Sequence, residues 1–168
     1  MTHSDTCADE RVAAVVAAYQ GLCAETLPAL LALYSEQAQF KDPFNEVCGR
    51  PAIEHIFRHM FDTLDAPRFV VATQVCQGDD AFLTWEFSFR RGAGGALLSI
   101  RGASHLHFSA AGGVDLHRDY WDPAEELYSK LPLLGAVMRG LRHLLSAQSK
   151  PWRKRQQITA NQGNHHEN

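Results

Sequence analysis

An aspartate in an apolar frame is the first candidate for chemistry. The stretch FKDPF, residues 40–44, puts Asp42 between two phenylalanines and directly before Pro43. An Asp-Pro pair begins turns, because proline favours an extended backbone at the residue before it. A carboxylate in an apolar pocket is instead poorly solvated, which raises a carboxyl pKa and makes the group a useful base. On these five residues alone, the turn is the favoured interpretation.

A second candidate lies near the end of the chain, in the stretch HRDYW. His117, Asp119 and Trp121 alternate there, and alternate side chains of a strand share one face. Asp119 and His117 could therefore form an acid/base pair. The structural alternative is that Asp119 pairs with a nearby arginine, Arg101 or Arg118. Both interpretations stay open at this point.

Other chemistry-bearing patterns are weak. His105 and His107 form an H-x-H motif that can ligate a metal, but no third ligand is evident and alternation turns both away from the His117 face. We therefore expect no metal site. The glycine-rich GAGG at residues 92–95 fits a hairpin, and neither a phosphate-binding loop nor a G-x-S-x-G elbow occurs.

Bulk composition predicts an ordinary globular chain. Its 168 residues are 45% hydrophobic and 21% charged, which fits one domain with a sizeable core. No run of 18 apolar residues predicts a membrane span, and the acidic start lacks the basic region of a secretory signal. Cys7, Cys23, Cys48 and Cys76 are irregularly spaced, which favours reduced, mostly buried thiols and a cytoplasmic location.

The net charge of −3 hides an asymmetry. Between residues 127 and 166 there are seven Lys and Arg side chains and no acid. A basic segment of this kind is usually a solvated tail. Contact with an anionic membrane is the less favoured alternative, and no nucleic-acid partner is expected because KPWRKR is short and has one aromatic residue.

The first half of the chain is predicted to be mainly helical. Apolar residues at helical spacing predict a helix over residues 6–23 and another from Pro51 to Leu64. A short helix begins between them at TLPALLALY, with Thr26 as its expected cap. The stretch AQFKDP, residues 38–43, is expected to be a strand.

The second half is predicted to be β-rich. Four runs separated by glycine-containing turns predict an antiparallel meander over residues 68–77, 80–91, 97–110 and 113–122. Asp122 and Pro123 then begin another helix, which Pro132 interrupts.

Helices that segregate from an antiparallel sheet define the α+β class. We expect a cone-shaped, strongly curved, mostly antiparallel sheet wrapped around the N-terminal helices, with an extra C-terminal helix. Its open, apolar interior is a natural ligand site. Residues 1–148 form the predicted single domain, with a core at 8–130 and an amphipathic helix at 132–147 that covers the body as a lid. Residues 149–168 are expected to be a flexible basic tail.

This order of elements, together with YSEQAQFKDPFNEVCGRPAI and GGVDLHRDYWDP, resembles the nuclear transport factor 2-like superfamily, in its ketosteroid isomerase-like and SnoaL-like branch. The resemblance covers roughly residues 8–130. It implies the cone fold, and it implies that the face of His117, Asp119 and Trp121 lines the cone.

Residue by residue, the resemblance to the isomerases is partial. It implies that Asp42 is the general base and that Tyr19 donates to the developing oxyanion, with Tyr34 as a second tyrosine before the first strand. Phe57 stands where the isomerases often carry a third tyrosine, and Ser104 where they carry a protonated aspartate. One oxyanion donor is worth about 3 kcal/mol of barrier, so the weaker donor at Ser104 predicts poor steroid isomerisation.

The function we expect is acid/base chemistry without a cofactor on an apolar, carbonyl-bearing small molecule such as a steroid- or polyketide-like compound. Asp42 is the expected base and Tyr19 the oxyanion donor, with Asp119 or His117 as an auxiliary acid/base group. The expected substrate contacts are Ser104, Trp121, Phe57, Tyr34 and Phe44.

The alternative is a non-catalytic module of the same fold that binds a lipid-like ligand or serves as a dimer scaffold. The resemblance also implies a homodimer through the outer face of the sheet, where Arg118 and Tyr120 point.

Overall fold

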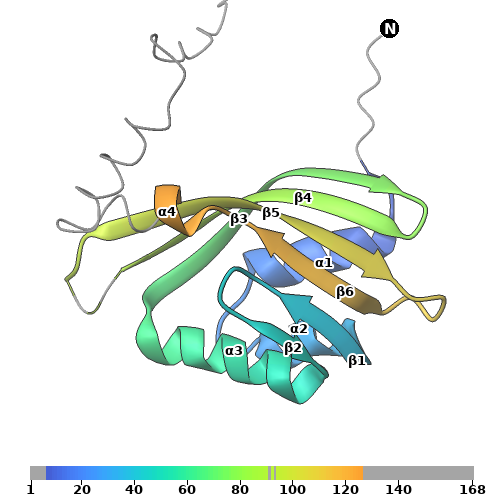
Figure 1. Cartoon of the computed structure of the whole chain (residues 1–168), viewed down its shortest axis with the longest axis horizontal. Helices are drawn as coiled ribbons and strands as arrows, with labels where there is room; N and C mark the ends of the chain where they lie inside the picture. Colours follow the sequence, from blue (N-terminus) through green and yellow to red (C-terminus); the bar gives the residue numbers. More distant parts are fainter. Residues whose placement is uncertain (1–6, 91, 93, 127–168) are drawn as a thin grey trace, which may run out of the picture.

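A computed structural model of the chain describes residues 7–90, 92 and 94–126, and confirms the α+β class. The sheet is curved and does not close, and the first three helices lie against it at one side (Figure 1). The helices are α1 (Glu10–Gln20), α2 (Leu27–Ala32), α3 (Arg50–Thr63) and α4 (Pro123–Glu126), and the strands are β1 (Tyr34–Lys41), β2 (Glu46–Cys48), β3 (Asp65–Gln77), β4 (Asp80–Arg90), β5 (Leu97–Phe108) and β6 (Val114–Tyr120).

The six strands lie in the order β2-β1-β6-β5-β4-β3. Strands β3 to β6 form the predicted antiparallel meander. Strand β1 joins this meander by pairing parallel to β6, with Phe40 opposite His117. This pairing brings the FKDPF stretch beside the HRDYW stretch, although the two lie far apart in the sequence.

The core lies between the helices and the inner face of the sheet. In β4, every second residue from Ala81 to Phe89 is buried, which is the alternation of a strand with one face on the core. Asp9 caps the start of helix α1, because its side chain accepts a hydrogen bond from the Arg11 backbone N–H at 2.8 Å, and the helix buries Tyr19 near its end. Helix α3 buries Ile53 and Phe57.

The predicted element boundaries differ from the structure at several points. Helix α1 is shorter than the predicted span of residues 6–23, β1 begins at Tyr34 rather than at residue 38, and β2 was not predicted. Thr26 precedes α2 without capping it through its side chain. Its hydroxyl instead accepts a hydrogen bond from the Cys23 N–H at 2.8 Å, within the preceding turn.

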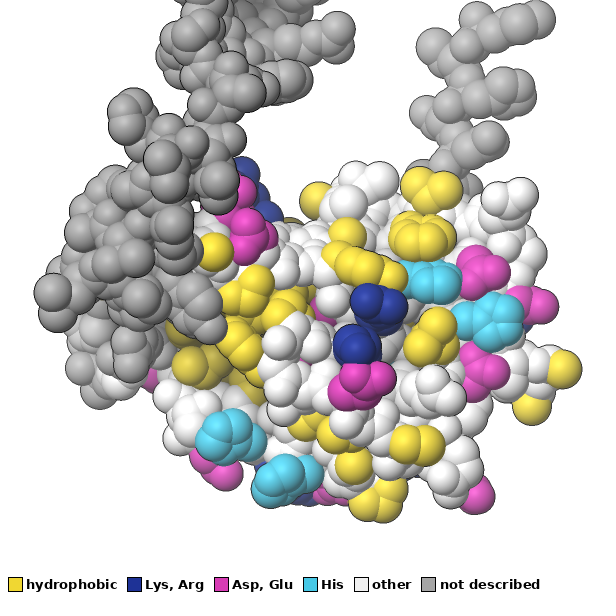
Figure 2. All heavy atoms as spheres, in the orientation of Figure 1, with side chains coloured by type: hydrophobic (Ala, Val, Ile, Leu, Met, Phe, Trp, Pro, Cys, Tyr) yellow, Lys and Arg dark blue, Asp and Glu magenta, His cyan; other side chains and the backbone are white. Residues whose placement is uncertain are grey.

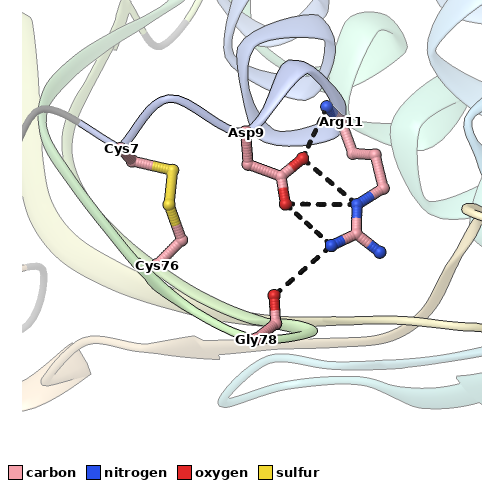
Figure 3. Close-up of a disulfide and its surroundings, with 5 residues drawn as sticks. All are labelled: Cys7, Asp9, Arg11, Cys76 and Gly78. Atoms are coloured by element: carbon pink, nitrogen blue, oxygen red, sulfur yellow. Dashed lines mark hydrogen bonds and ion pairs between the residues drawn. A yellow bond between two sulfur atoms is a disulfide. The ribbon is translucent and has the colours of Figure 1, made fainter.

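The expectation of reduced, mostly buried thiols is wrong. Cys7 and Cys76 form a disulfide that ties the chain before α1 to β3 (Figure 3), and Cys48 is exposed. Beside the disulfide, Arg11 forms an ion pair with Asp9 at 2.7 Å and reaches the Gly78 carbonyl at 3.3 Å, from the turn after β3. The start of α1 is therefore fixed to β3 covalently and electrostatically. The cytoplasmic location, which assumed reduced thiols, stays a prediction.

Two predictions fall on other parts of the chain. The amphipathic helix at 132–147 and the basic tail at 149–168 lie outside the described residues. In the ranges that are described, no helix is long and apolar enough to cross a membrane.

Candidate functional site

A cavity of about 500 Å³ lies between the inner face of the sheet, α1, α3 and the turn after β1. Hydrophobic side chains gather between α3 and the strands in the space-filling view (Figure 2). The cavity walls are mainly aromatic, and its size is within the range of small-molecule sites. The aromatic wall consists of Tyr19, Phe40, Phe44, Phe57, Phe69, Trp85, Phe87, Phe89 and Trp121.

Behind one wall of the cavity, His117 is the centre of a buried hydrogen-bonded network. Its Nδ1 lies 2.6 Å from the Tyr34 hydroxyl and 3.2 Å from the Tyr19 hydroxyl, and these two hydroxyls are 2.8 Å apart. Its Nε2 lies 2.8 Å from Asp119 Oδ1. Ser104 Oγ donates to the same carboxylate oxygen at 2.5 Å. Five side chains from α1, β1, β5 and β6 are thus joined in one network.

The donors of this network point toward Asp119. An ionised carboxylate only accepts hydrogen bonds, so His117 carries its proton on Nε2 and donates it to Asp119. In the neutral imidazole, Nδ1 of His117 then accepts from the Tyr34 hydroxyl, whose oxygen can accept from Tyr19. Asp119 Oδ1 therefore receives two hydrogen bonds, whereas Oδ2 takes none from the part of the chain that is described. Asp119 also lines the cavity.

Both tyrosines of the network are held in their neutral form. Burial is the main cause that raises the pKa of Tyr19 well above its ordinary value, and the neighbouring Tyr34 and Asp119 add to this. Burial likewise raises the pKa of Tyr34. Tyr19 lines the cavity, so it presents a hydroxyl that stays protonated and can donate a hydrogen bond.

Asp42 lies at the cavity and in a turn at the same time. Its Oδ1 accepts from the backbone N–H groups of Phe44 at 2.7 Å and Asn45 at 2.6 Å. The Asn45 side-chain amide lies 2.9 Å from Oδ2. The carboxylate organises the turn after β1, as the turn interpretation expects, and it also lines the cavity. Its role as a base stays a prediction.

Trp85, on β4, extends the hydrogen-bonded network to a further strand. Its indole N–H donates to Ser104 Oγ at 2.8 Å. The ring lies across Gly102 on the neighbouring strand, where an added Cβ would come within 2.4 Å of the indole. Only glycine leaves room for this ring, so Gly102 determines where Trp85 lies and how its N–H is aimed.

The structure brings the predicted site residues together in two layers. Asp42, Phe44, Phe57, Tyr19, Asp119 and Trp121 line the cavity. Tyr34, His117 and Ser104 lie behind it, buried within the hydrogen-bonded network. Asp119 does not pair with Arg101 or Arg118: Arg101 binds Glu126 at 2.9 Å, and the Arg118 guanidinium lies over the Tyr120 ring.

Trp85, Asn45 and Gly102 also belong to the site but were not predicted as site residues. A glycine inside a strand is a sequence signal for close approach of another group, and Gly102 gives that signal. Nothing in the sequence singles out Trp85 among the aromatic residues of β4.

His105 and His107 lie on the outer face of the sheet, away from the cavity, as alternation predicted. Both imidazoles contact Asp80 Oδ1, His105 through Nε2 at 2.6 Å and His107 through Nδ1 at 3.1 Å. Across the described ranges, no group of three or more His, Cys, Asp or Glu side chains is arranged to hold a metal ion.

A cone-shaped α+β fold with one apolar cavity at the concave face of the sheet defines the class of nuclear transport factor 2-like proteins. A family model described as the SnoaL-like domain matches residues 12–117, and the chain belongs to this family. No curated protein sequence matches the chain.

Solved structures share the fold at low identity. A protein of ketosteroid isomerase-like fold from Catenulispora acidiphila, crystallised with trimethylamine, is 17% identical with a TM-score of 0.61, over 70% of this chain and 89% of that one. A putative polyketide cyclase from Pseudomonas putida is 18% identical with a TM-score of 0.57, over 67% of this chain and 90% of that one. TerC, co-crystallised with polyporic acid, is 14% identical with a TM-score of 0.59, over 69% and 92% of the two chains. These similarities show the fold alone.

Proposed function

We propose that the protein is an acid/base enzyme that needs no cofactor and moves a proton next to a carbonyl group of an apolar small molecule. Isomerisation, cyclisation and dehydration all begin with such a step. The observation that carries the proposal is the arrangement of Asp119: two donors fix one carboxylate oxygen, the other receives no hydrogen bond from the described residues, and the side chain lines an apolar cavity.

Asp119 is the base in this proposal. His117 and Ser104 hold its carboxylate in one orientation, which removes the need to order it when the substrate arrives. General-base catalysis of this kind contributes about 10²–10⁴ in rate. We assign this role to Asp119 rather than Asp42, because hydrogen bonds of the turn already engage both oxygens of Asp42.

Tyr19 is the proposed oxyanion donor. Its hydroxyl stays protonated and lies at the cavity, so it can turn from Tyr34 toward the oxygen on which charge develops. Tyr34 and His117 lie behind Tyr19 and position it, and Ser104 acts through Asp119. The substrate contacts a mainly aromatic wall, which includes Phe44, Phe57 and Trp121.

The structural relatives support a small-molecule occupant. One is crystallised with trimethylamine, one with polyporic acid, and one is described as a putative polyketide cyclase. Compounds with an aromatic or alicyclic body and a ketone are therefore the first to test.

The experiment follows proton exchange rather than a guessed product. Steroid and aromatic ketones are incubated with the protein in D2O, and deuterium incorporation beside the carbonyl is measured by NMR. We expect catalysed exchange with at least one ketone, and Asp119→Asn should reduce it about 10²–10⁴-fold. Asp80→Asn, on the outer face of the sheet, is the matched control and should leave exchange unchanged.

Saturable binding of ketones without any exchange would show that the cavity is a binding module and would overturn the catalytic role. Exchange that survives Asp119→Asn but is lost in Asp42→Asn would transfer the role of base to Asp42.

We also propose a homodimer through the outer face of the sheet. Phe82, Val75 and Tyr120 are large hydrophobic side chains exposed on this face, and exposed apolar side chains that lie together are typical of protein interfaces. Light scattering should give twice the chain mass, and Phe82→Asp should reduce it to that of a monomer. A monomer at all concentrations would contradict this proposal.

A further inference from the structure

The described lining of the cavity contains acids but no Lys or Arg. Its carboxylates are Asp42 and Asp119, and its one imidazole is His59, on α3. The remaining wall is mainly aromatic and aliphatic. This cavity therefore has negative charge and no fixed positive charge from the residues that the structure describes.

Neither carboxylate is neutralised by a cationic side chain in the described chain. Asp119 receives its hydrogen bonds from His117 and Ser104, and neither Lys nor Arg contacts it among the described residues. Asp42 receives its hydrogen bonds from two backbone N–H groups and the Asn45 amide. These donors orient the carboxylates but leave their charges uncompensated.

Aromatic rings stand next to Asp42. Phe44, two residues further along, packs edge-to-face against Trp121 with 5.3 Å between ring centroids, and both rings line the cavity. Aromatic faces attract cations, with tryptophan the strongest of them. Asp42, Phe44 and Trp121 line the same cavity and so offer it a carboxylate and aromatic rings, the two features that bind an alkylammonium group.

We propose that the ligand of this cavity carries a positive charge, as a protonated or quaternary amine on an apolar body, and that Asp42, Phe44 and Trp121 receive this charge. The inference rests on the proposed function, since it names the class of substrate for the same site. Asp42 then supplies recognition, and Asp119 supplies the base.

The same charges disfavour anionic ligands. A carboxylate in the cavity would lie near Asp42 and Asp119 without a Lys or Arg in the described lining to offset the repulsion. In a site with little water, charge repulsion is stronger than at the protein surface. Among ligands of equal shape, the affinity of the site should therefore be highest for an ammonium compound, lower for a neutral one and lowest for a carboxylate.

Three naphthalene probes test this order by calorimetry on the full-length protein. The first carries a CH2–N(CH3)3⁺ group, the second the neutral CH2–C(CH3)3 group of the same shape, and the third a CH2–COO⁻ group. The ammonium group is quaternary, so it cannot exchange a proton and reports charge alone. We expect the ammonium probe to bind about tenfold more tightly than the neutral probe, and the carboxylate probe to bind most weakly.

The informative variant is Asp42→Asn. An asparagine oxygen can still accept from the backbone of Phe44 and Asn45, so the turn is kept while the charge is removed. The preference for ammonium over the neutral probe should fall to about twofold or less, while the affinity of the neutral probe stays the same. Asp80→Asn should change neither value.

Three results would overturn the inference: no saturable binding of the ammonium probe, a carboxylate probe that binds as tightly as the ammonium probe, or a preference that Asp42→Asn leaves unchanged. None of these measurements requires turnover. An intact ammonium preference in a protein that exchanges no ketone protons would sink the proposed catalysis alone.

Discussion

Two aspartate–histidine pairs lie on opposite faces of one sheet, and their contact distances hardly differ. On the inner face, His117 Nε2 is 2.8 Å from Asp119 Oδ1, and on the outer face, His105 Nε2 is 2.6 Å from Asp80 Oδ1. Their surroundings differ strongly: the side chains of His117 and Asp119 are 2% and 17% exposed, whereas those of His105 and Asp80 are 22% and 44% exposed.

The partners of each pair differ as well. The second nitrogen of His117 contacts two buried tyrosines, and Asp119 faces an apolar cavity. On the outer face, visible in Figure 2, Asp80 Oδ1 is shared with His107, and the ring of His105 stacks on Phe82 with 4.5 Å between centroids. The comparison teaches that a short contact does not identify a functional pair. Burial and a continuous set of donors distinguish the inner pair, because exposed pairs contribute little.

The largest effect is expected from loosening α1, the helix that contacts the inner pair but not the outer pair. Helix α1 brings Tyr19 to His117, and the Cys7–Cys76 disulfide ties the start of that helix to β3. The disulfide closes a separation of 69 residues, for which loop entropy predicts about 4 kcal/mol of unfolding free energy. Cys7→Ser with Cys76→Ser should lose about that amount in urea unfolding.

Imidazole NMR signals provide a sharper test, because His117 contacts α1 through Tyr19, whereas His105 and His107 lie on the outer face of the sheet. The signal of His117 should shift in the double serine variant, while those of His105 and His107 stay unchanged. Equal shifts at all three histidines would show that the disulfide supports the whole sheet rather than the inner face.

The next largest effect compares the two histidines. His117→Ala removes a fully buried ring and leaves Tyr34 and Asp119 without their shared partner, so we expect a loss of about 3 kcal/mol in unfolding free energy. His105→Ala should lose less than about 1 kcal/mol. Guanidinium unfolding of both variants gives the comparison, and equal losses would remove the distinction between the two pairs.

A smaller effect is expected for single hydroxyl groups. Tyr34→Phe removes the 2.6 Å hydrogen bond to His117 Nδ1 inside the core, which should cost about 1–2 kcal/mol. Tyr120→Phe, on the exposed face, should stay within about 0.5 kcal/mol of the wild type. Thermal unfolding of the two variants checks this, and a neutral Tyr34→Phe would mean that Tyr19 takes over the contact.

The smallest effect concerns the outer pair and pH. The hydrogen bond from His105, with a second from His107, lowers the pKa of Asp80 below its ordinary value of 3.8. The lowered pKa stabilises the folded state above pH 3.8, and this contribution is lost as the pH falls through the folded-state pKa. The difference in urea midpoint between wild type and Asp80→Asn should therefore shrink between pH 5 and pH 3. A difference in urea midpoint that grows as the pH falls from 5 to 3 would contradict the lowered pKa of Asp80.

Local patterns predicted most of the sheet. Alternation in β4 and glycine turns between the runs gave the meander, because each strand has one buried face and the hairpins are local. The start of β1 was missed because Ser35, Glu36 and Gln37 break its alternation. Strand β2 has only three residues and little apolar character, so no sequence pattern marks it.

The site was less predictable because it depends on pairings between distant segments. Alternation placed His117, Asp119 and Trp121 on one face. The contact between Ser104 and Asp119 also requires the register of β5 and β6, which shifts between His107 and Phe108. The Tyr34–His117 contact requires the parallel pairing of β1 with β6. Irregular spacing likewise gave no sign that Cys7 and Cys76 meet.

A substitution at Gly102 would change the shape of the cavity, and with it the size of ligand that the cavity accepts. Because Gly102 has no side chain, the Trp85 ring can lie across it, and the main cavity and a small second void share Tyr19, Phe69, Trp85 and Asp119 as lining. Any larger residue at position 102 would push the indole away from Ser104. One codon change could thus alter the depth of the cavity while every acid and base keeps its identity, so selection could change ligand size independently of the chemistry.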